Sequence, residues 1–328
     1  MPRRFLVTGG AGYVGSHLVA AIHDQGDTPV VLDNLSVGHR HAVPGDVKLI
    51  EADLADAAGI DAVLKQGPWD AVFHFAALSQ VGESMRDPLR YLMENAGNGM
   101  RLIDACVRHG VPRFVLSSTA ALFNVAADAP IPEDAPIDPQ SAYGESKWMI
   151  ERALRWASQV HGLRYACLRY FNAAGADPQG RLGEDHRPET HLMPLAIDAA
   201  LGLRPPLTVF GIDYPTRDGT CVRDYIHVTD LAAAHLLAYD AMAHGDISWN
   251  LGNGAGYSVM EVLQAVERVT GRSVPHILSD RRPGDAASLV ASAEPALKAG
   301  WQPKHAALDD IVRTAFLWRQ AHPNGYGN

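Results

Sequence analysis

A glycine-rich turn near the N-terminus constrains the fold of this 328-residue chain more than any other feature. The apolar run Phe5-Leu6-Val7 predicts a buried strand, and Gly9, Gly12 and Gly15 follow it directly. Apolar residues at helical spacing come next, over 13–25. Glycines at this spacing allow a tight turn, and they let backbone N–H groups approach a pyrophosphate at the start of a helix. The pattern predicts a strand–turn–helix unit that holds a dinucleotide.

Strands alternate with helices through the first half of the chain. Apolar runs predict further strands at 29–32, 47–50, 71–74, 113–116 and 165–169. Further helices are expected over 56–66, 88–109 and 142–161. This alternation indicates parallel βαβ units, and therefore an α/β fold with a Rossmann-like, doubly wound parallel sheet. Such sheets bind ligands beyond the carboxyl ends of their strands.

The regular alternation ends near residue 175, where prolines, glycines and polar residues become frequent. We therefore expect two domains. Residues 1–175 would form the dinucleotide-binding domain, and residues 176–328 would form most of a smaller α/β lobe that binds substrate. Some segments of the second part are expected to return to the sheet.

Composition restricts the class of protein. The chain is 47% hydrophobic with a formal net charge of -9, and this acidity argues against a nucleic-acid partner. No apolar run is long enough to span a bilayer, and no signal peptide is expected before the first strand. Cys106, Cys167 and Cys221 are far apart in the sequence, which fits reduced thiols and predicts neither disulfides nor a metal site. We expect a cytoplasmic protein.

Two carboxylates follow predicted strands near the glycine turn. Asp33 ends the second strand, 18 residues after Gly15, where a carboxylate can accept hydrogen bonds from a ribose diol. A carboxylate there repels a 2′-phosphate, which favours NAD over NADP. A helix cap or turn is the alternative role of Asp33. Asp53 could receive an adenine amino group or could cap a strand end, and the sequence leaves both roles open.

A tyrosine and a lysine predict acid–base chemistry. Tyr143 and Lys147 lie four residues apart on a predicted helix, so they share one face. A free tyrosine has a pKa of about 10, and a nearby ammonium group lowers it. The hydroxyl run Ser117-Ser118-Thr119 ends the fifth predicted strand and could share the proton of a sugar alcohol. Strand-end hydrogen bonding is the alternative role of that run.

Taken together, these motifs resemble the extended short-chain dehydrogenase/reductase family. Within it, the chain is similar to the UDP-glucose 4-epimerases. The more specific motifs are Asp218-Gly219-Thr220-Cys221-Val222-Arg223-Asp224-Tyr225-Ile226-His227-Val228 and His322-Pro323-Asn324-Gly325-Tyr326. The chain departs from the family pattern at Phe123-Asn124, where the family often has Tyr-Gly, and at Ser79, where some members have lysine.

The resemblance implies roles for individual residues. Tyr143 would remove the proton of the sugar 4-OH, Lys147 would keep Tyr143 acidic, and Thr119 would help proton transfer. The cofactor site would comprise Gly9, Gly12, Tyr13, Val14, Gly15, Asp33, Asn34, Asp53, Leu54, Phe75, Ala76, Ala77, Asn95, Tyr143, Lys147 and Tyr170. The substrate site would comprise Thr119, Tyr143, Asn172, Leu192, Phe210, Arg223, Tyr225, Arg282, Asp285 and Leu289.

The resemblance implies an NAD-dependent enzyme that interconverts UDP-glucose and UDP-galactose through a 4-keto sugar. It also implies a homodimer formed by the helices over 88–109 and 142–161. Epimerisation of UDP-GlcNAc, UDP-xylose or UDP-glucuronate stays open, because the mid-sized Leu289 does not settle sugar selectivity. A non-catalytic NAD-binding regulator is the alternative from another class. A 4,6-dehydratase is disfavoured because Ala120-Ala121 replaces the carboxylate pair that it needs.

Overall fold

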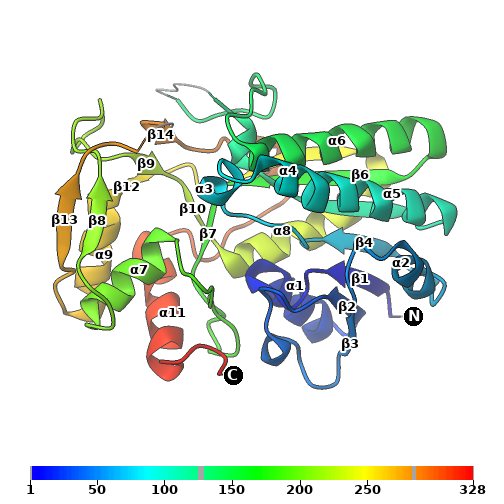
Figure 1. The fold of residues 1–328 in the computed structure, drawn as a ribbon, viewed down its shortest axis with the longest axis horizontal. Coiled ribbons are helices and arrows are strands. Elements are labelled where there is room, and N and C mark those ends of the chain that lie inside the picture. Colours follow the sequence, from blue (N-terminus) through cyan, green and yellow to red (C-terminus); the bar gives the residue numbers. More distant parts are fainter. Residues whose placement is uncertain (1, 125–128, 283–285, 328) are drawn as a thin grey trace.

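A parallel sheet forms the centre of the computed structural model, which describes residues 2–124, 129–282 and 286–327 (Figure 1). Over these residues the sheet has seven strands in the order β11-β6-β5-β4-β1-β2-β3. Their bounds are β1 (Arg4–Thr8), β2 (Thr28–Asp33), β3 (Lys48–Glu51), β4 (Ala71–His74), β5 (Arg113–Thr119), β6 (Arg164–Tyr170) and β11 (Ile247–Leu251). The order reverses between β1 and β4, which is where such sheets bind ligands. The predicted Rossmann-like fold class is confirmed.

Helices cover both faces of the sheet (Figure 1). Helices α1 (Tyr13–Asp24) and α8 (Val228–Ala241) lie on one face, while α2 (Ala57–Leu64), α5 (Asn98–Arg108) and α6 (Ala142–His161) lie on the other. Successive residues of β1 show the two layers. Phe5 and Val7 pack with Leu18 of α1, whereas Leu6 packs with Leu102 of α5 and Ile150 of α6. Burial on both faces explains why the strands are continuous apolar runs.

The helix predicted over 88–109 is interrupted by a π-helical turn. After the short α3 (Val81–Ser84), the chain forms α4 (Pro88–Tyr91), the π-helix η2 (Leu92–Gly97) and then α5. A π turn holds one residue more than an α turn and is often found at functional sites. The predicted cofactor residue Asn95 lies within it.

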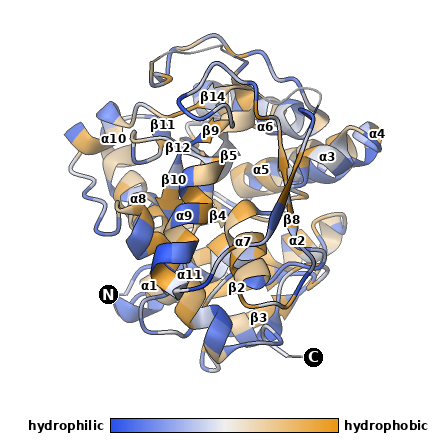
Figure 2. Ribbon diagram, turned by 90° about the vertical axis from the view of Figure 1, so that its left-hand side faces the viewer, coloured by the Kyte–Doolittle hydropathy of each residue, from blue (hydrophilic) through white to orange (hydrophobic). Residues whose placement is uncertain are grey.

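A second layered unit lies at the left of Figure 1 and is built from segments on both sides of β11 in the sequence. Helices α7 (Leu192–Ala200), α9 (Val259–Thr270) and α11 (Leu308–Ala321) share an apolar core with β8 (Leu207–Phe210), which pairs in parallel with β13 (His276–Ser279). Figure 2 shows both hydrophobic and hydrophilic residues on α11, as expected for a helix that covers a core on one side, whereas α7 is mainly hydrophobic.

Short strands link this unit to the sheet. β7 (Asn172–Ala174) pairs with β10 (Tyr225–His227). β9 (Val222–Arg223) lies between β12 (Tyr257–Ser258) and β14 (Ser288–Leu289). The remaining elements are η1 (Arg40–Ala42), η3 (Ala120–Leu122), η4 (Met242–His244) and α10 (Glu294–Lys298). Among the described residues, no helix has the length and apolar character needed to cross a membrane.

Candidate active site

The glycine turn lies directly after β1, at the point where the strand order reverses. Gly9 has a φ of +72°, and its N–H donates to the carbonyl of Leu32 at 2.9 Å. A Cβ atom on Gly9 would lie 2.4 Å from the backbone nitrogen of Ala76, and one on Gly15 would lie 2.2 Å from the carbonyl oxygen of Gly9. Gly12 begins α1 without a side-chain cap, which leaves N–H groups for an anion. This close-packed turn fits a dinucleotide pyrophosphate.

Asp33 lies beside the turn at the carboxyl end of β2 and is 7% exposed. Its Oδ2 accepts the N–H of Ala11 at 3.0 Å, and its Oδ1 accepts the N–H of Leu35 at 2.9 Å. Burial raises the pKa of Asp33, although both backbone hydrogen bonds oppose the rise. A buried carboxylate held by backbone N–H groups keeps further lone pairs for a diol, so the geometry fits a ribose.

Asp53 makes local hydrogen bonds of the capping kind, and its contact with an adenine amino group stays a prediction. Its Oδ1 accepts the N–H of Ala55 at 2.7 Å, and its Oδ2 accepts Nδ2 of Asn34 at 2.8 Å. Both hydrogen bonds favour the charged form and lower the pKa of Asp53. Leu54 is buried beneath them. The contact joins two predicted cofactor residues, Asn34 and Asp53, from the ends of neighbouring strands.

Asn95 ties the π turn to the loop after β4 and to α6. Its Oδ1 accepts the N–H of Leu78 at 2.8 Å, and its Nδ2 donates to the carbonyl of Leu78 at 2.9 Å and to Oγ of Ser146 at 3.1 Å. Ser146 in turn donates to the carbonyl of Tyr143 at 2.7 Å. The half-buried Phe75, Ala76 and Ala77 lie in the loop that this network fixes.

Tyr143 lies in the first turn of α6, near Thr119 at the end of β5. Burial raises the pKa of Tyr143, and the neighbouring Thr119 hydroxyl partly offsets the rise. A Cβ atom on Gly144 would lie 2.3 Å from the carbonyl oxygen of Ala121. Only glycine permits this close approach of α6 to the segment after β5, which brings Tyr143 and Thr119 together.

Lys147 lies one turn after Tyr143 and is 1% exposed. Its Nζ donates to the carbonyl of Ser117 at 2.8 Å. Burial lowers the pKa of Lys147 to about 8, and the charge of Glu151 opposes the decrease. The ammonium group is therefore mostly charged at neutral pH and points at the end of β5.

Sequence reasoning missed Glu151, which extends the same face of α6 by another turn. Its carboxylate is 4% exposed, lies 2.6 Å from Nη2 of Arg169 and also accepts a hydrogen bond from Ser118. The sequence does contain a signal, because Tyr143, Lys147 and Glu151 follow each other at intervals of four residues. A charged residue on the inner face of a helix needs a buried partner.

His74 lies at the carboxyl end of β4, on the same edge of the sheet. Its Nδ1 is 2.7 Å from Oγ1 of Thr8, and burial together with the charge of Lys147 lowers its pKa to about 3.

Two predicted cofactor tyrosines have neighbouring partners. The Tyr170 hydroxyl contacts Oγ of Ser117, and the Tyr13 hydroxyl donates to the carbonyl of Gly175 at 2.6 Å.

The predicted substrate residues lie on short elements. Asn172 donates through Nδ2 to the carbonyl of Asp224 at 2.8 Å. Arg223 donates through Nη1 to the carbonyl of Ala286 at 2.8 Å and pairs with Leu289 across β9 and β14. Tyr225, on the adjacent β10, is buried.

The other predicted substrate residues come from the second unit. The guanidinium of the exposed Arg282 is 4.8 Å from the centre of the Phe210 ring, at the end of β8. Leu192 is half-buried at the first position of α7. Asp285 lies outside the described residues.

The two departures from the family pattern have different surroundings. Phe123 is buried, with the Arg169 guanidinium 5.7 Å from its ring centre, and Asn124 donates to Oδ2 of Asp138 at 3.0 Å. Ser79 is exposed in the loop after β4. Neither residue contacts Tyr143 or Thr119 in the hydrogen bonds described.

The sequence matches known proteins along nearly its whole length. Residues 5–252 match the model of the NAD dependent epimerase/dehydratase family. The chain is 48% identical over 327 residues to a UDP-glucose 4-epimerase of Azospirillum brasilense, which covers 99% of this chain and 94% of that protein. It is 47% identical over 324 residues to a UDP-glucose 4-epimerase of Halalkalibacterium halodurans, which covers 98% of this chain and 97% of that protein.

The fold agrees with these sequence matches. A crystal structure of the UDP-glucose 4-epimerase from Brucella ovis in complex with NAD superposes with a TM-score of 0.93. The two proteins are 44% identical, and the match covers 96% of this chain and 98% of that chain. The resemblance inferred from the motifs is thus confirmed, and the chain belongs to the NAD dependent epimerase/dehydratase family.

Proposed function

We propose that the chain is an NAD-dependent UDP-glucose 4-epimerase that interconverts UDP-glucose and UDP-galactose. C4 of the sugar is oxidised to a ketone and then reduced on the opposite face. The observation that carries this proposal is that Tyr143 lies beside the Thr119 hydroxyl at the end of β5, with the Lys147 ammonium fixed to the same strand end one helical turn behind it. This group lies at the carboxyl edge of the sheet, the edge that also carries the glycine turn.

The cofactor is held by residues at the carboxyl edge of the sheet. The turn over Gly9, Gly12 and Gly15 binds the pyrophosphate, and Asp33 binds the adenosine ribose. When bound, NAD supplies the acceptor for the C4 hydride and the donor for its return. Lys147 and Tyr143, at the end of β5, bind the nicotinamide side. The protein must retain the cofactor through the cycle, because its loss would strand a ketone.

Tyr143 holds and moves the proton. As a phenolate, Tyr143 would take the proton of the sugar 4-OH as the hydride leaves C4, and would return it when C4 is reduced. Thr119 shares the hydrogen bond and guides the proton between the two oxygens. A tyrosine whose pKa is raised by burial needs a compensating positive charge to act at neutral pH.

Lys147 supplies that charge. The Ser117 carbonyl fixes its ammonium group, and the Glu151 carboxylate keeps it protonated despite burial. In a buried site, a cation one turn away stabilises a phenolate far more than it does in water. Glu151 is therefore a positioning residue that acts through Lys147, and its contact with Arg169 holds it in place.

The UDP part is bound by the short strands and loops of the second unit. Arginine suits a diphosphate because its planar fork bonds two oxygens at once. The residues proposed to hold the substrate are Asn172, Leu192, Phe210, Arg223, Tyr225, Arg282, Asp285 and Leu289. Leu289 adjoins Arg223 through strand pairing, so its size bears on which sugar is accepted.

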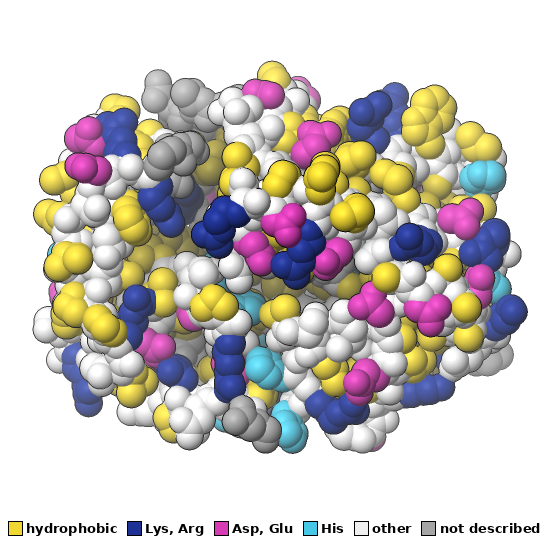
Figure 3. Space-filling model, in the orientation of Figure 1, with side chains coloured by type: hydrophobic (Ala, Val, Ile, Leu, Met, Phe, Trp, Pro, Cys, Tyr) yellow, Lys and Arg dark blue, Asp and Glu magenta, His cyan; other side chains and the backbone are white. Residues whose placement is uncertain are grey.

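We also propose a homodimer. Five apolar side chains on α3 to α6 and the turns between them are 61–68% exposed, namely Met85, Leu89, Met93, Trp156 and Val160. Figure 3 shows hydrophobic side chains among charged ones over these elements. Leu102, Ile103, Ile150 and Leu154, which lie on the same helices, are buried in the core and do not contribute to this surface. A protein of 35.3 kDa that sediments as a monomer at micromolar concentration would contradict the dimer.

We propose a cytoplasmic location, supported by three buried free cysteines, which are typical of reducing compartments.

The test of the function is incubation of the purified protein with UDP-galactose, followed by chromatographic separation of the nucleotide sugars. UDP-glucose should accumulate to equilibrium without added cofactor, and denaturation should release NAD. Parallel incubations with UDP-GlcNAc, UDP-xylose and UDP-glucuronate rank the sugars. Conversion of one of these and not of UDP-galactose would replace the proposed substrate, and conversion of none would favour a regulator.

A further inference from the structure

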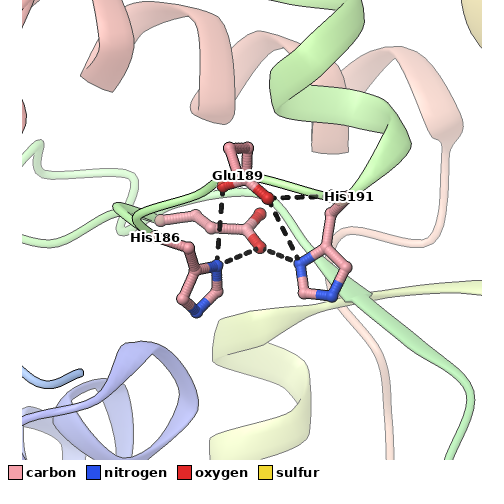
Figure 4. A group of neighbouring side chains, drawn as sticks. His186, Glu189 and His191 are labelled. Carbon is pink, nitrogen blue, oxygen red and sulfur yellow. Dashed lines mark hydrogen bonds and ion pairs between the residues drawn. The ribbon is translucent and has the colours of Figure 1, made fainter. Parts of the chain in front are cut away.

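Four potential metal ligands meet in the segment that leads into α7. They are Glu184, His186, Glu189 and His191, and one ligand atom from each lies within 4.8 Å of the others. Figure 4 shows the labelled side chains of His186, Glu189 and His191 pointing toward one another. The sequence analysis predicted no metal site, because it considered only the cysteine spacing.

The contacts converge on imidazole nitrogens and carboxylate oxygens. Oε1 of Glu184 contacts Nδ1 of both histidines, at 3.2 Å for His186 and closer for His191. Oε2 of Glu189 is 3.5 Å from Nδ1 of His186, and Oε1 of Glu189 is 3.8 Å from Nδ1 of His191. Two imidazole nitrogens and two carboxylates therefore form one compact group.

The side chains of this segment point alternately to two sides of the backbone. Glu184 and His186 face the cluster, whereas the alternating Asp185 and Arg187 face the other way. A backbone N–H group of the C-terminal segment 322–326 donates to Oδ2 of Asp185 at 3.0 Å. Nη2 of Arg187 donates to a backbone carbonyl of the same segment at 3.2 Å. Alternation with a period of two is typical of extended chain. The C-terminal segment thus holds the outer side and leaves the inner side to the cluster.

The ligand set also has the supporting contacts that metal sites use. Oε1 of Glu189 accepts the N–H groups of Thr190 at 2.7 Å and His191 at 2.8 Å, which fixes the carboxylate. The side chains of Glu184, Glu189 and His186 are 8%, 16% and 21% exposed. Hydrogen bonds from outside the ligand set typically orient the ligands of a metal.

We propose that Glu184, His186, Glu189 and His191 bind a divalent transition-metal ion, with Zn²⁺ as the reference ion. Two imidazoles and two carboxylates form a set that Zn²⁺ accepts in tetrahedral geometry, and two negative charges balance the ion. The alternative is an ion-pair network in which both histidines are protonated. That network needs one Glu184 oxygen to serve two cations, whereas a metal gives each ligand its own bond.

The proposed ion has a structural role that is independent of the epimerase assignment. The ring of His186 is 6.1 Å from that of Tyr13, which begins α1 after the glycine turn. His191 directly precedes Leu192, the first residue of α7. A bound ion would therefore fix the segment between the cofactor turn and the substrate residues of α7.

The test uses the purified holoenzyme without an affinity tag. After chelator treatment and dialysis, the protein is equilibrated with ZnCl₂, and bound metal is measured by atomic emission. We expect one Zn²⁺ per chain and a melting temperature that rises with Zn²⁺ concentration. Co²⁺ in place of Zn²⁺ should give the intense visible absorption of tetrahedral cobalt.

Variants assign the site. His186→Ala and His191→Ala should each weaken Zn²⁺ binding by about tenfold or more, whereas His244→Ala, an exposed histidine on η4, should bind as the unaltered protein does. Binding of less than one equivalent by the unaltered protein, or equal affinity in all variants, would overturn the proposal. If the variants do not fold, the cobalt spectrum of the unaltered protein decides, because absence of tetrahedral bands overturns the site.

Discussion

The two sides of the candidate active site are built differently. On the sheet side, Tyr143 and Lys147 lie on a helix of 20 residues, and Lys147 is fixed by a hydrogen bond to the end of β5. On the other side, Arg223 and Leu289 lie on strands of two residues, and Arg282 is exposed. The residues proposed to carry the chemistry thus lie on long elements, and those proposed to hold the UDP-sugar lie on short strands or in loops. Changes on the sheet side should therefore alter rate and stability, whereas changes on the lobe side should alter substrate affinity.

The strongest test of this contrast is Tyr143→Phe. Loss of the hydroxyl removes general acid–base help, so we expect kcat to fall by about 10²–10⁴-fold. Binding of UDP, measured by calorimetry, should hardly change, because the phenyl ring keeps its packing. Tyr165→Phe on β6 is the matched control and should leave kcat unaltered. An unchanged rate in Tyr143→Phe would mean that another group moves the proton.

The next test removes the carboxylate charge of Glu151, which raises the pKa of Lys147. Glu151→Gln leaves the buried Arg169 without its carboxylate, and breaking such a pair typically costs about 3–5 kcal/mol of unfolding free energy. Urea denaturation followed by circular dichroism measures the loss. Glu145→Gln, in the first turn of the same helix, is the control and should cost less than about 1 kcal/mol. Equal stability of the two variants would contradict the role of the pair.

Glu151→Gln should also change the pH dependence of the activity. Lys147 has a pKa of about 8 in the folded protein, so its charge is present below that value and is lost as pH rises through it. Activity should fall on the alkaline side near pH 8. Because Glu151 raises the pKa of Lys147, Glu151→Gln should move this alkaline limb to lower pH. A pH–rate profile of kcat that stays in place would show that Glu151 is purely structural.

A smaller effect is expected for the choice of cofactor. A 2′-phosphate about 5 Å from Asp33 would be disfavoured by about 3 kcal/mol, or about 10²-fold in affinity, at an effective dielectric constant near 20. Fluorescence titration of NAD-free protein with NADH and NADPH measures the ratio. Asp33→Asn should narrow it. Equal affinities in the unaltered protein would refute the assignment of Asp33.

The smallest effect sharpens the contrast from the lobe side. Arg223→Lys removes the planar fork but keeps the charge, so we expect KM for UDP-galactose to rise about tenfold with kcat within about twofold. Arg272→Lys, an exposed change after α9, is the control. A fall in kcat without a change in KM would break the contrast, because it would give a lobe residue a role in the chemistry.

The sheet side could be predicted because its signals are local. Apolar runs, the spacing of Gly9, Gly12 and Gly15, and Asp33 at a strand end are all visible in short windows of sequence. The boundary near residue 175 and the site residues as a set stay predictions. The π turn had no signal, because extending the helical spacing over 88–109 cannot reveal one additional residue.

The lobe side could not be predicted in the same way. Strands β9, β12 and β14 pair residues up to 66 positions apart, as Arg223 does with Leu289, and two-residue strands carry no periodicity. Several contacts also involve backbone groups, such as the carbonyl of Ala286, which any residue could supply. The Glu184–His191 cluster spans only eight positions. The sequence does not show which side chains of this segment face one another, because that depends on the contacts of Asp185 and Arg187 with the C-terminal segment.

The π turn at 92–97 changes the direction in which side chains point around the helix axis, between the residues before it and those after it. Each residue of an α-helix advances the side-chain direction by about 100°. The additional residue therefore sets the angle between Asn95, which faces Leu78 and Ser146, and Leu102 and Ile103, which face the core. Deleting one residue from this turn would restore a regular helix, but only one of the two surfaces could then keep its direction. Cofactor loop and core are thus aligned by a single residue of chain length.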